Sequence, residues 1–260
     1  MGLLADILAG KKREIAALRD RPRSPSKRTP IDVLAALRRG RGPLRLIAEV
    51  KLRSPSAGPL SRALPPDARA EAYAASGAAM VSVLCDGPFF DGSWDHLAAA
   101  RARLDAAGLA VPLLAKDFVI DERQAEEARD RGADAVLLIA RIVDRARLRE
   151  LARCAREAGL EPLVEVVDEA ELAAALAAGA RLVGVNARDL DSLAMDAERT
   201  ARVLGAIPPE VVAVHLSGVR APADVALLSR GRADAALVGE ALMRQDDPRP
   251  ALRAMVTAAG

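Results

Sequence analysis

The sequence contains little cysteine and little histidine. Its two cysteines, Cys85 and Cys154, lie far apart and do not have the spacing of a metal-binding pair, so we expect a reduced chain in the cytoplasm. His96 and His215 are the only histidines, which excludes a histidine-rich metal centre.

The chain also lacks long apolar runs and long runs of charge of one sign. No apolar segment approaches the length of a membrane span, and residues 1–12 are too short and too charged for a signal peptide. The formal net charge is +2, and acidic and basic residues are interspersed. These features argue against nucleic acid or a membrane as the main partner.

The chain does contain a regular succession of short apolar runs. Hydrophobic residues make up 51% of the sequence, which is enough for a large buried core. The apolar runs are continuous rather than alternating, as expected for strands that are covered on both faces. There are eight of them, at 46–50, 80–84, 112–115, 135–139, 162–166, 182–185, 211–214 and 235–238.

Segments with helical spacing, rich in Ala, Arg and Glu, follow these runs and commonly end at Gly. They lie at 67–76, 93–107, 121–131, 144–158, 168–178, 197–204, 222–229 and 248–257. Eight strand–helix units in succession predict a parallel (β/α)₈ TIM barrel. We expect one domain over 1–260, with a helical N-terminal extension over 1–44 and the barrel over 45–260. A doubly wound open sheet is the alternative, but no GxGxxG motif follows the first strand.

Two charged residues lie at the end of the first predicted strand. Active sites of such barrels form at the carboxyl ends of the strands. At a period of two, Ile47, Glu49 and Lys51 share one face, which we expect to point into the barrel mouth. A buried ion pair without a catalytic role is about as common as a catalytic one, so this pair alone does not distinguish a structural role from a catalytic role.

The positions of the lysines give a second indication of chemistry at the strand ends. The chain strongly prefers Arg; its five lysines are Lys11, Lys12, Lys27, Lys51 and Lys116. The first three lie in the polar N-terminal extension, whereas the other two lie at strand ends. Lysine can lose its proton when it is desolvated or near another cation, and Arg cannot. Proton transfer is therefore the favoured role for Lys51 and Lys116, ahead of a structural salt bridge.

Three polar residues end the fifth and sixth predicted strands. Glu165 interrupts an apolar run, so it is either paired in the core or a general base. Asn186 either satisfies loop backbone groups or contacts a ligand. Arg188 either forms a surface ion pair or contacts a ligand.

Glycine-containing turns follow the last two predicted strands, at Ser217-Gly218 and Gly239-Glu240. In barrels, turns at these two places commonly bind phosphate through backbone N–H groups. A single glycine after a strand is a weak signal, but its recurrence in both units makes a phosphorylated small-molecule substrate the preferred partner. Ser54 and Ser56 in the first loop are further candidate donors.

These motifs together resemble one family. The segment IAEVKLRSPS at 47–56 is similar to the first-strand signature of the indole-3-glycerol phosphate synthase family, a highly specific motif. Later signatures of the family match in order: VSVL at 81–84, FFDGS at 89–93, KDF at 116–118, LVEV at 163–166, GVNARDL at 184–190, SG at 217–218 and LVGEALM at 237–243. The resemblance spans nearly the whole chain.

The resemblance implies a carboxy-lyase of tryptophan biosynthesis that acts without metal or organic cofactor. The family converts 1-(2-carboxyphenylamino)-1-deoxyribulose 5-phosphate into indole-3-glycerol phosphate by ring closure, loss of carbon dioxide and loss of water. By position, Lys116 resembles the general acid of ring closure, and Glu165 resembles the general base of dehydration. Lys51 would hold the substrate carboxylate or phosphate, and Glu49 would orient and charge-balance the two lysines.

The remaining site residues also follow from the resemblance. They are Asn186 and Arg188 at the anthranilate part, Ser54, Ser56, Phe118 and Leu216 as further substrate contacts, and Ser217, Gly218, Gly239 and Glu240 at the phosphate. We expect a monomer or a weak homodimer.

Three positions depart from the family pattern. Leu216 stands where the family usually has Glu, His215 where it has Ala, and Cys85 where it has Thr. Because that Glu belongs to the active-site set, alternatives are a paralogue acting on a related substrate and a weakly active or non-catalytic relative. A sugar-phosphate isomerase would share the phosphate turns but would not need both Lys51 and Lys116.

Overall fold

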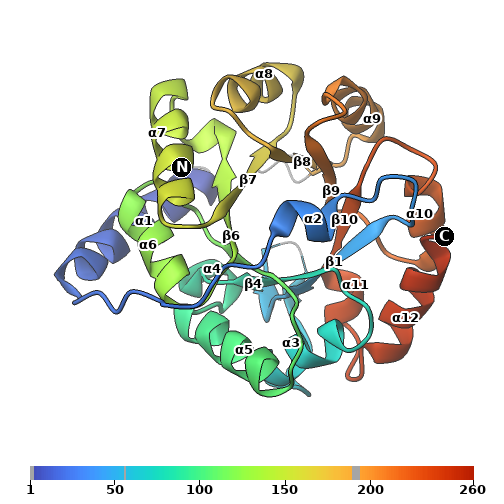
Figure 1. Ribbon diagram of the computed structural model, residues 1–260, viewed down its shortest axis with the longest axis horizontal. Coiled ribbons are helices and arrows are strands. Elements are labelled where there is room, and N and C mark those ends of the chain that lie inside the picture. Colours follow the sequence, from blue (N-terminus) through green and yellow to red (C-terminus); the bar gives the residue numbers. More distant parts are fainter. Residues whose placement is uncertain (1–2, 56, 189–193) are drawn as a thin grey trace.

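The computed structural model describes residues 3–55, 57–188 and 194–260. Within these residues, parallel strands form a closed barrel surrounded by helices (Figure 1). The barrel strands are β1 (Arg45–Val50), β4 (Met80–Leu84), β5 (Leu113–Lys116), β6 (Ala135–Ile139), β7 (Glu161–Val166), β8 (Leu182–Asn186), β9 (Val212–Leu216) and β10 (Ala235–Val238). They follow one another around the barrel in chain order, and β10 pairs with β1. The predicted (β/α)₈ TIM barrel is confirmed.

Helices connect successive strands. They are α3 (Pro66–Ala74), α5 (Trp94–Ala106), α6 (Glu122–Asp130), α7 (Arg145–Glu157), α8 (Glu169–Ala177), α9 (Ala197–Ala206), α10 (Pro222–Leu228) and α12 (Arg249–Ala258), with the short elements α4 (Gly87–Phe90), η1 (Ala140–Ile142) and α11 (Glu240–Met243). Polar side chains cap several of them; for example, the Asp121 side chain accepts a hydrogen bond from Arg123 N at the start of α6. The predicted helices differ from these only at their ends.

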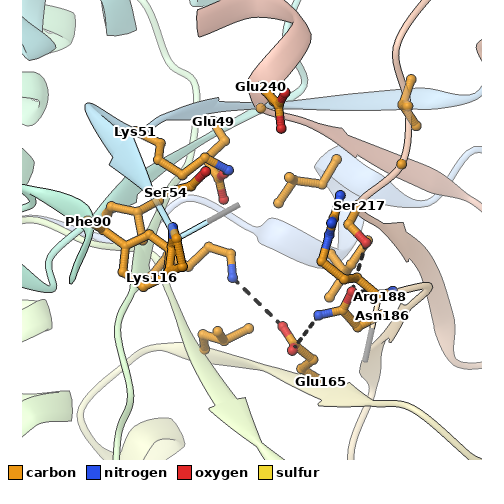
Figure 2. A pocket seen from close by; sticks show the side chains of 18 of the residues that line it. Glu49, Lys51, Ser54, Phe90, Lys116, Glu165, Asn186, Arg188, Ser217 and Glu240 are labelled. Atoms are coloured by element: carbon orange, nitrogen blue, oxygen red, sulfur yellow. Dashed lines mark hydrogen bonds and ion pairs between the residues drawn. The ribbon is translucent and has the colours of Figure 1, made fainter. Parts of the chain in front are cut away.

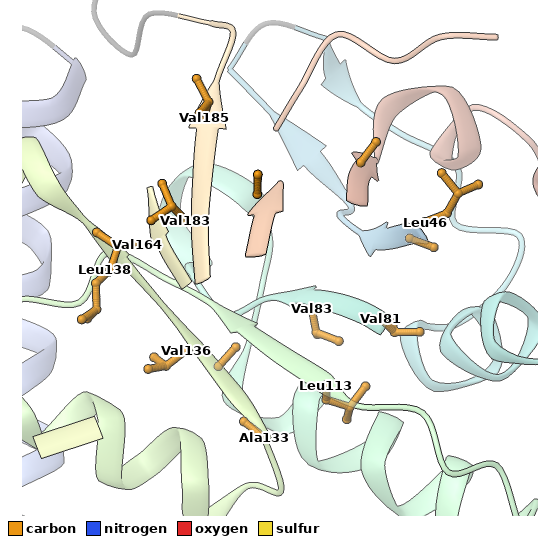
Figure 3. Packing of buried hydrophobic residues seen from close by; sticks show 14 of the residues in the cluster. Leu46, Val81, Val83, Leu113, Ala133, Val136, Leu138, Val164, Val183 and Val185 are labelled. Atoms are coloured by element: carbon orange, nitrogen blue, oxygen red, sulfur yellow. The ribbon is translucent and has the colours of Figure 1, made fainter. Parts of the chain in front are cut away.

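The period of two along each strand separates two apolar layers. In β1, Ile47 packs inside the barrel, whereas Ala48 and Val50 belong to the cluster between the sheet and the helices. Figure 3 shows this outer cluster, with Val81 and Val164 among its members. The inner layer is filled by apolar side chains, and the polar residues of the predicted site lie beyond it at the carboxyl end.

The N-terminal segment adds helices to both ends of the barrel. α2 (Val33–Leu37) contacts β1 and β4, and its Val33 and Leu37 join the inner apolar cluster. α1 (Leu3–Asp20) lies beside α6 (Figure 1) and supplies Leu4 and Ile7 to the wall of a cavity at the carboxyl end. Along the described chain, no helix combines the length and apolar character that crossing a membrane requires.

A short antiparallel pair, β2 (Arg53–Ser54) and β3 (Gly58–Pro59), shapes the loop after β1. In this loop Arg53 forms an ion pair of 3.0 Å with Asp91 in the segment after β4. The two loops therefore meet at the rim of the barrel mouth. Ser56, predicted as a substrate contact, lies outside the described residues.

Candidate active site

A cavity of about 550 Å³ opens at the carboxyl ends of the strands. Figure 2 shows that its polar side chains come from opposite sides of the barrel mouth and face a common space. The predicted site residues that line it are Glu49, Lys51, Ser54, Lys116, Phe118, Glu165, Asn186, Arg188, Leu216, Ser217, Gly218, Gly239 and Glu240. The topology thus brings together every predicted site residue that the structure describes.

Glu49 and Lys51 form a close ion pair at the end of β1. Lys51 Nζ lies 2.7 Å from Glu49 Oε1, and Glu49 is 2% exposed. Burial by itself raises the pKa of Glu49, but the ammonium groups of Lys51 and Lys116 outweigh it and the net pKa is lowered. The two lysines therefore favour the charged form of Glu49.

Gly239 provides the space for this pair. A Cβ atom built on Gly239 would lie 2.6 Å from Glu49 Oε1 and 3.3 Å from Lys51 Nζ. Any side chain at this position would push the carboxylate out of place. The turn after β10 and the pair at the end of β1 are therefore packed directly against each other.

Lys116 and Glu165 face each other across the cavity. Lys116 Nζ lies 3.7 Å from Glu165 Oε2, a distance that fits an ion pair but is too long for a hydrogen bond. Glu165 Oε1 accepts a hydrogen bond of 2.9 Å from Asn186 Nδ2. Glu165 Oε2 is buried and has no hydrogen-bond partner among the described residues. One carboxylate oxygen is thus held by Asn186, and the other faces the Lys116 ammonium without a hydrogen bond.

Asn186 is fixed by three hydrogen bonds. Its Oδ1 accepts from Ser217 Oγ at 2.8 Å and from Arg188 N at 3.0 Å, while its Nδ2 donates to Glu165 (Figure 2). These partners define which end of the amide is oxygen. Asn186 therefore satisfies a loop backbone group, one of the two roles considered for it, and it also orients Glu165.

The turn after β9 has a backbone suited to an anion. Ser217 and Gly218 both have positive φ, 70° and 90°. Successive N–H groups of such turns make concave anion sites. The positive φ of Ser217 is uncommon for a residue other than glycine, and its hydroxyl is held by Asn186.

The second turn brings a carboxylate to the wall of the same cavity. Glu240 begins α11, and its Oε1 accepts hydrogen bonds of 2.8 and 3.1 Å from Arg244. The ion pair with Arg244 neutralises Glu240, which would otherwise repel a phosphate. Both Glu240 and Arg244 line the cavity.

Ser54 and Phe118 complete the wall on the side of β1 and β5. Ser54 Oγ accepts a hydrogen bond of 3.1 Å from Ala57 N. The ring of Phe118 lies against that of Phe90, with centroids 6.0 Å apart. Together these rings make one side of the cavity apolar.

Leu216 occupies an apolar position between Asn186 and Leu237. It pairs in register with Asn186, is 2% exposed, and lies against Leu163 and Gly184. A Cβ on Gly184 would meet Leu216 Cδ1 at 2.5 Å, so the glycine makes room for the leucine side chain. The part of the floor at the end of β9 therefore offers no hydrogen bond.

Lys11 was missed in the sequence, where it was assigned to a polar extension. It is 1% exposed and lies 2.7 Å from Asp117 Oδ1 and 2.9 Å from Asp86 Oδ1. The signal that reveals it is its spacing, because it continues the buried stripe of α1 at i, i+3 and i+4. This stripe comprises Leu4, Ile7, Lys11, Ile15 and Leu18.

No group of three or more His, Cys, Asp or Glu side chains is arranged to hold a metal ion within the part of the chain that the structure describes. The fold and the cavity define a class: a TIM-barrel enzyme with ammonium and carboxylate groups at the carboxyl ends of its strands, beside a turn in which two successive residues have positive φ.

Comparison with known proteins identifies the family within this class. The family model described as indole-3-glycerol phosphate synthase matches residues 4–255. An indole-3-glycerol phosphate synthase of Parafrankia sp. is 46% identical over 99% of this chain and 93% of its own length. One of Mycobacterium ulcerans is 44% identical, covering 88% of this chain and 82% of its own. The chain belongs to the indole-3-glycerol phosphate synthase family, carboxy-lyases of tryptophan biosynthesis. A paralogue with another substrate is not favoured by these relatives.

Solved structures with much lower identity share the fold. The tryptophan synthase α subunit of Legionella pneumophila has a TM-score of 0.64 at 16% identity, over 87% of this chain and 96% of that one. The 3-hexulose-6-phosphate synthase of Salmonella typhimurium has a TM-score of 0.62 at 17% identity, over 83% of this chain and 98% of that one. At such identities the likeness concerns the barrel alone.

Proposed function

We propose that this cavity converts 1-(2-carboxyphenylamino)-1-deoxyribulose 5-phosphate into indole-3-glycerol phosphate, with Lys116 and Glu165 as the acid and base. The observation that carries the proposal is the ammonium of Lys116, which lies 3.7 Å from the Glu165 oxygen that accepts no hydrogen bond, both residues lining the cavity. An acid and a base at this separation can serve two atoms of one substrate.

Lys116 is the general acid of ring closure. A new carbon–carbon bond forms between the aromatic ring and the sugar carbonyl carbon, and the carbonyl oxygen takes a proton from the Lys116 ammonium. Loss of carbon dioxide then returns the bond electrons to the ring. The side chain is 21% exposed in the cavity, so it can reach a ligand there.

Glu165 is the general base of dehydration. The hydroxyl made by ring closure takes a proton from the Lys51 ammonium and leaves as water, while the new ring loses a proton to Glu165 Oε2. Asn186 holds the other oxygen, so the basic oxygen keeps its direction toward the cavity. This is the arrangement that a positioned base requires.

The remaining residues bind and orient the substrate. Lys51 contacts its carboxylate or phosphate, and Glu49 orients the two lysines through its ion pair with Lys51 and its proximity to Lys116. The other contacts are Asn186 and Arg188 at the anthranilate part, Ser54, Phe118 and Leu216 along the wall, and Ser217, Gly218, Gly239 and Glu240 at the phosphate. Glu240 acts there through its backbone, because Arg244 holds its carboxylate.

The proposal extends to the cellular compartment, the oligomeric state and the partners of the protein. Cys85 and Cys154 are both free thiols, as expected for a protein of the reducing cytoplasm. We expect the chain to work there as a monomer or a weak homodimer, on a small phosphorylated substrate and without nucleic acid or membrane.

Incubation of the purified protein with the anilino-deoxyribulose phosphate tests the reaction directly. We expect indole fluorescence to appear, together with one carbon dioxide released per product. Substrate that remains unchanged at high protein concentration, with the protein folded by circular dichroism, would refute the proposal.

A further inference from the structure

The charged side chains that line the cavity are almost completely paired with one another. Three cation–carboxylate pairs lie within the lining: Lys51 with Glu49, Lys116 with Glu165, and Arg244 with Glu240. A fourth lining carboxylate, Asp117, is paired with Lys11 behind the wall. A substrate with a carboxylate and a phosphate therefore needs positive charge beyond these pairs. Two more cations line the cavity: Arg188 after β8, which is assigned to the anthranilate part, and Arg220 after β9.

Arg220 differs from the other lining cations. Its guanidinium makes no ion pair or side-chain hydrogen bond with any residue in the described ranges, although it lines the cavity and is exposed. It lies two residues after Gly218, at the rim of the turn with positive φ.

The backbone under Arg220 is fixed even though its side chain is free. Asp224 Oδ2 accepts hydrogen bonds from Arg220 N at 2.8 Å and from Ala221 N at 3.0 Å. Val219 is buried and anchors the other side. A fixed backbone with an unpaired guanidinium can close over an anion without losing an existing contact.

We propose that Arg220 binds the substrate phosphate at the Ser217-Gly218 turn, as a residue of the binding site that adds to the backbone donors. This inference rests on the proposed function for the identity of the substrate, but not for the anion site. Arg244 assists by keeping the Glu240 carboxylate neutralised, which leaves Arg220 as the cation that meets the phosphate. A guanidinium matches phosphate oxygens with two parallel N–H donors.

The experiment uses the full chain, inorganic phosphate as probe, and the variant Arg220→Gln. Arg230→Gln is the matched control, because Arg230 is also exposed but follows α10, at the opposite end of the barrel. We expect Arg220→Gln to weaken phosphate binding by about tenfold. This is the lower end of the range for a hydrogen bond that involves a charge, because an exposed side chain gains less from such a bond. Arg230→Gln should bind as the natural protein does. Arg220→Lys keeps the charge but not the two parallel donors, so its loss of affinity should be smaller than that of Arg220→Gln.

Two further measurements separate the phosphate from the rest of the substrate. The KM of the phosphorylated substrate should rise in Arg220→Gln with little change in kcat, whereas binding of the same compound without phosphate should be unaffected. The salt dependence of phosphate binding should also be smaller in Arg220→Gln.

Equal phosphate affinity in Arg220→Gln and Arg230→Gln would overturn the inference, and so would an equal loss for the compound without phosphate. If the substrate turns over normally in Arg220→Gln with unchanged KM, this inference fails and the proposed function stands. If phosphate binding depends on Arg220 but the substrate never reacts, the proposed function fails and this inference stands.

Discussion

The ammonium of Lys11 lies 2.7 Å from Asp117 Oδ1, so a buried ion pair joins the N-terminal helix to the residue after Lys116. A second bond of 2.9 Å reaches Asp86, at the end of the neighbouring strand β4. Burial lowers the pKa of Lys11, but the carboxylates of Asp117 and Asp86 outweigh it and the net pKa is raised. Lys11 therefore stays charged and ties α1 to the rim of the cavity.

Replacing Lys11 should destabilise the fold strongly. Lys11→Met leaves the carboxylates of Asp86 and Asp117 buried without their cation. Removing one partner of a buried ion pair typically lowers the free energy of unfolding by about 3–5 kcal/mol. Unfolding in urea measures the change. Lys12→Met is the control, because Lys12 neighbours Lys11 but is exposed. A loss as small as that of the control would show that the cluster contributes no net stability.

Removing the proposed acid should stop ring closure while the fold survives. Lys116→Ala should lower turnover by about 10²–10⁴, the usual contribution of a positioned proton donor. Its thermal midpoint should stay close to that of the natural protein, because Lys116 is partly exposed and its ion pair with Glu165 is long. Lys12→Ala serves as control for loss of a lysine. A Lys116→Ala protein with near-normal turnover would remove Lys116 from the mechanism.

Leu216 should limit the rate on the expected substrate. A carboxylate at this position could accept hydrogen bonds from sugar hydroxyls, and a hydrogen bond involving a charge is worth about 1.5–3 kcal/mol. If the whole of this free energy acts on the transition state, it corresponds to a change in rate of roughly 10- to 150-fold. We therefore expect weak synthase activity and a higher kcat/KM in Leu216→Glu.

Leu216→Met is the matched control, since it preserves the apolar contacts with Gly184 and Leu163. Steady-state kinetics of the three proteins decide the matter. Efficient turnover by the natural protein that falls on introducing Glu would mean that the pocket is built around leucine.

His215 should make stability depend on pH below neutrality. Burial lowers the pKa of His215 below its ordinary value of 6.5, and its Nδ1 is buried without a hydrogen-bond partner. The unfolded chain then takes up a proton at higher pH than the folded chain. The contribution of neutral His215 is complete above the unfolded pKa and is lost as the pH falls below it.

His215→Ala should therefore lose less stability than the natural protein between pH 7.5 and about pH 5. Thermal midpoints of both proteins across this range measure the difference. His96 is present in both proteins, so its lowered pKa cancels. Parallel curves would mean that His215 is protonated equally in the folded and unfolded states.

The strand ends illustrate how much of the site could be predicted from the sequence. Glu49 and Lys51 were placed inside the barrel by the period of two, and both line the cavity. Lys116, Glu165 and Asn186 were recognised because each follows or interrupts a buried apolar run. In a parallel barrel all strands end at one rim, so knowing the strands is enough to know that these residues gather there.

The pairing of charges was decided by the tertiary structure alone. Asp117 and Lys11 are far apart in the sequence, and only the docking of α1 brings them to 2.7 Å. The contact of Glu165 with Lys116 and the unpaired guanidinium of Arg220 likewise depend on which side chains meet across the cavity. The pair of Glu240 with Arg244 is an exception, because these residues are four apart in the sequence.

The sequence by itself therefore determined the strands, their inward faces and the end at which chemistry takes place. These follow from local periodicity and from the rule that parallel strands end together. The structure decided which charge meets which, because an ion pair needs two side chains within about 4 Å and no local pattern specifies a distance between remote segments.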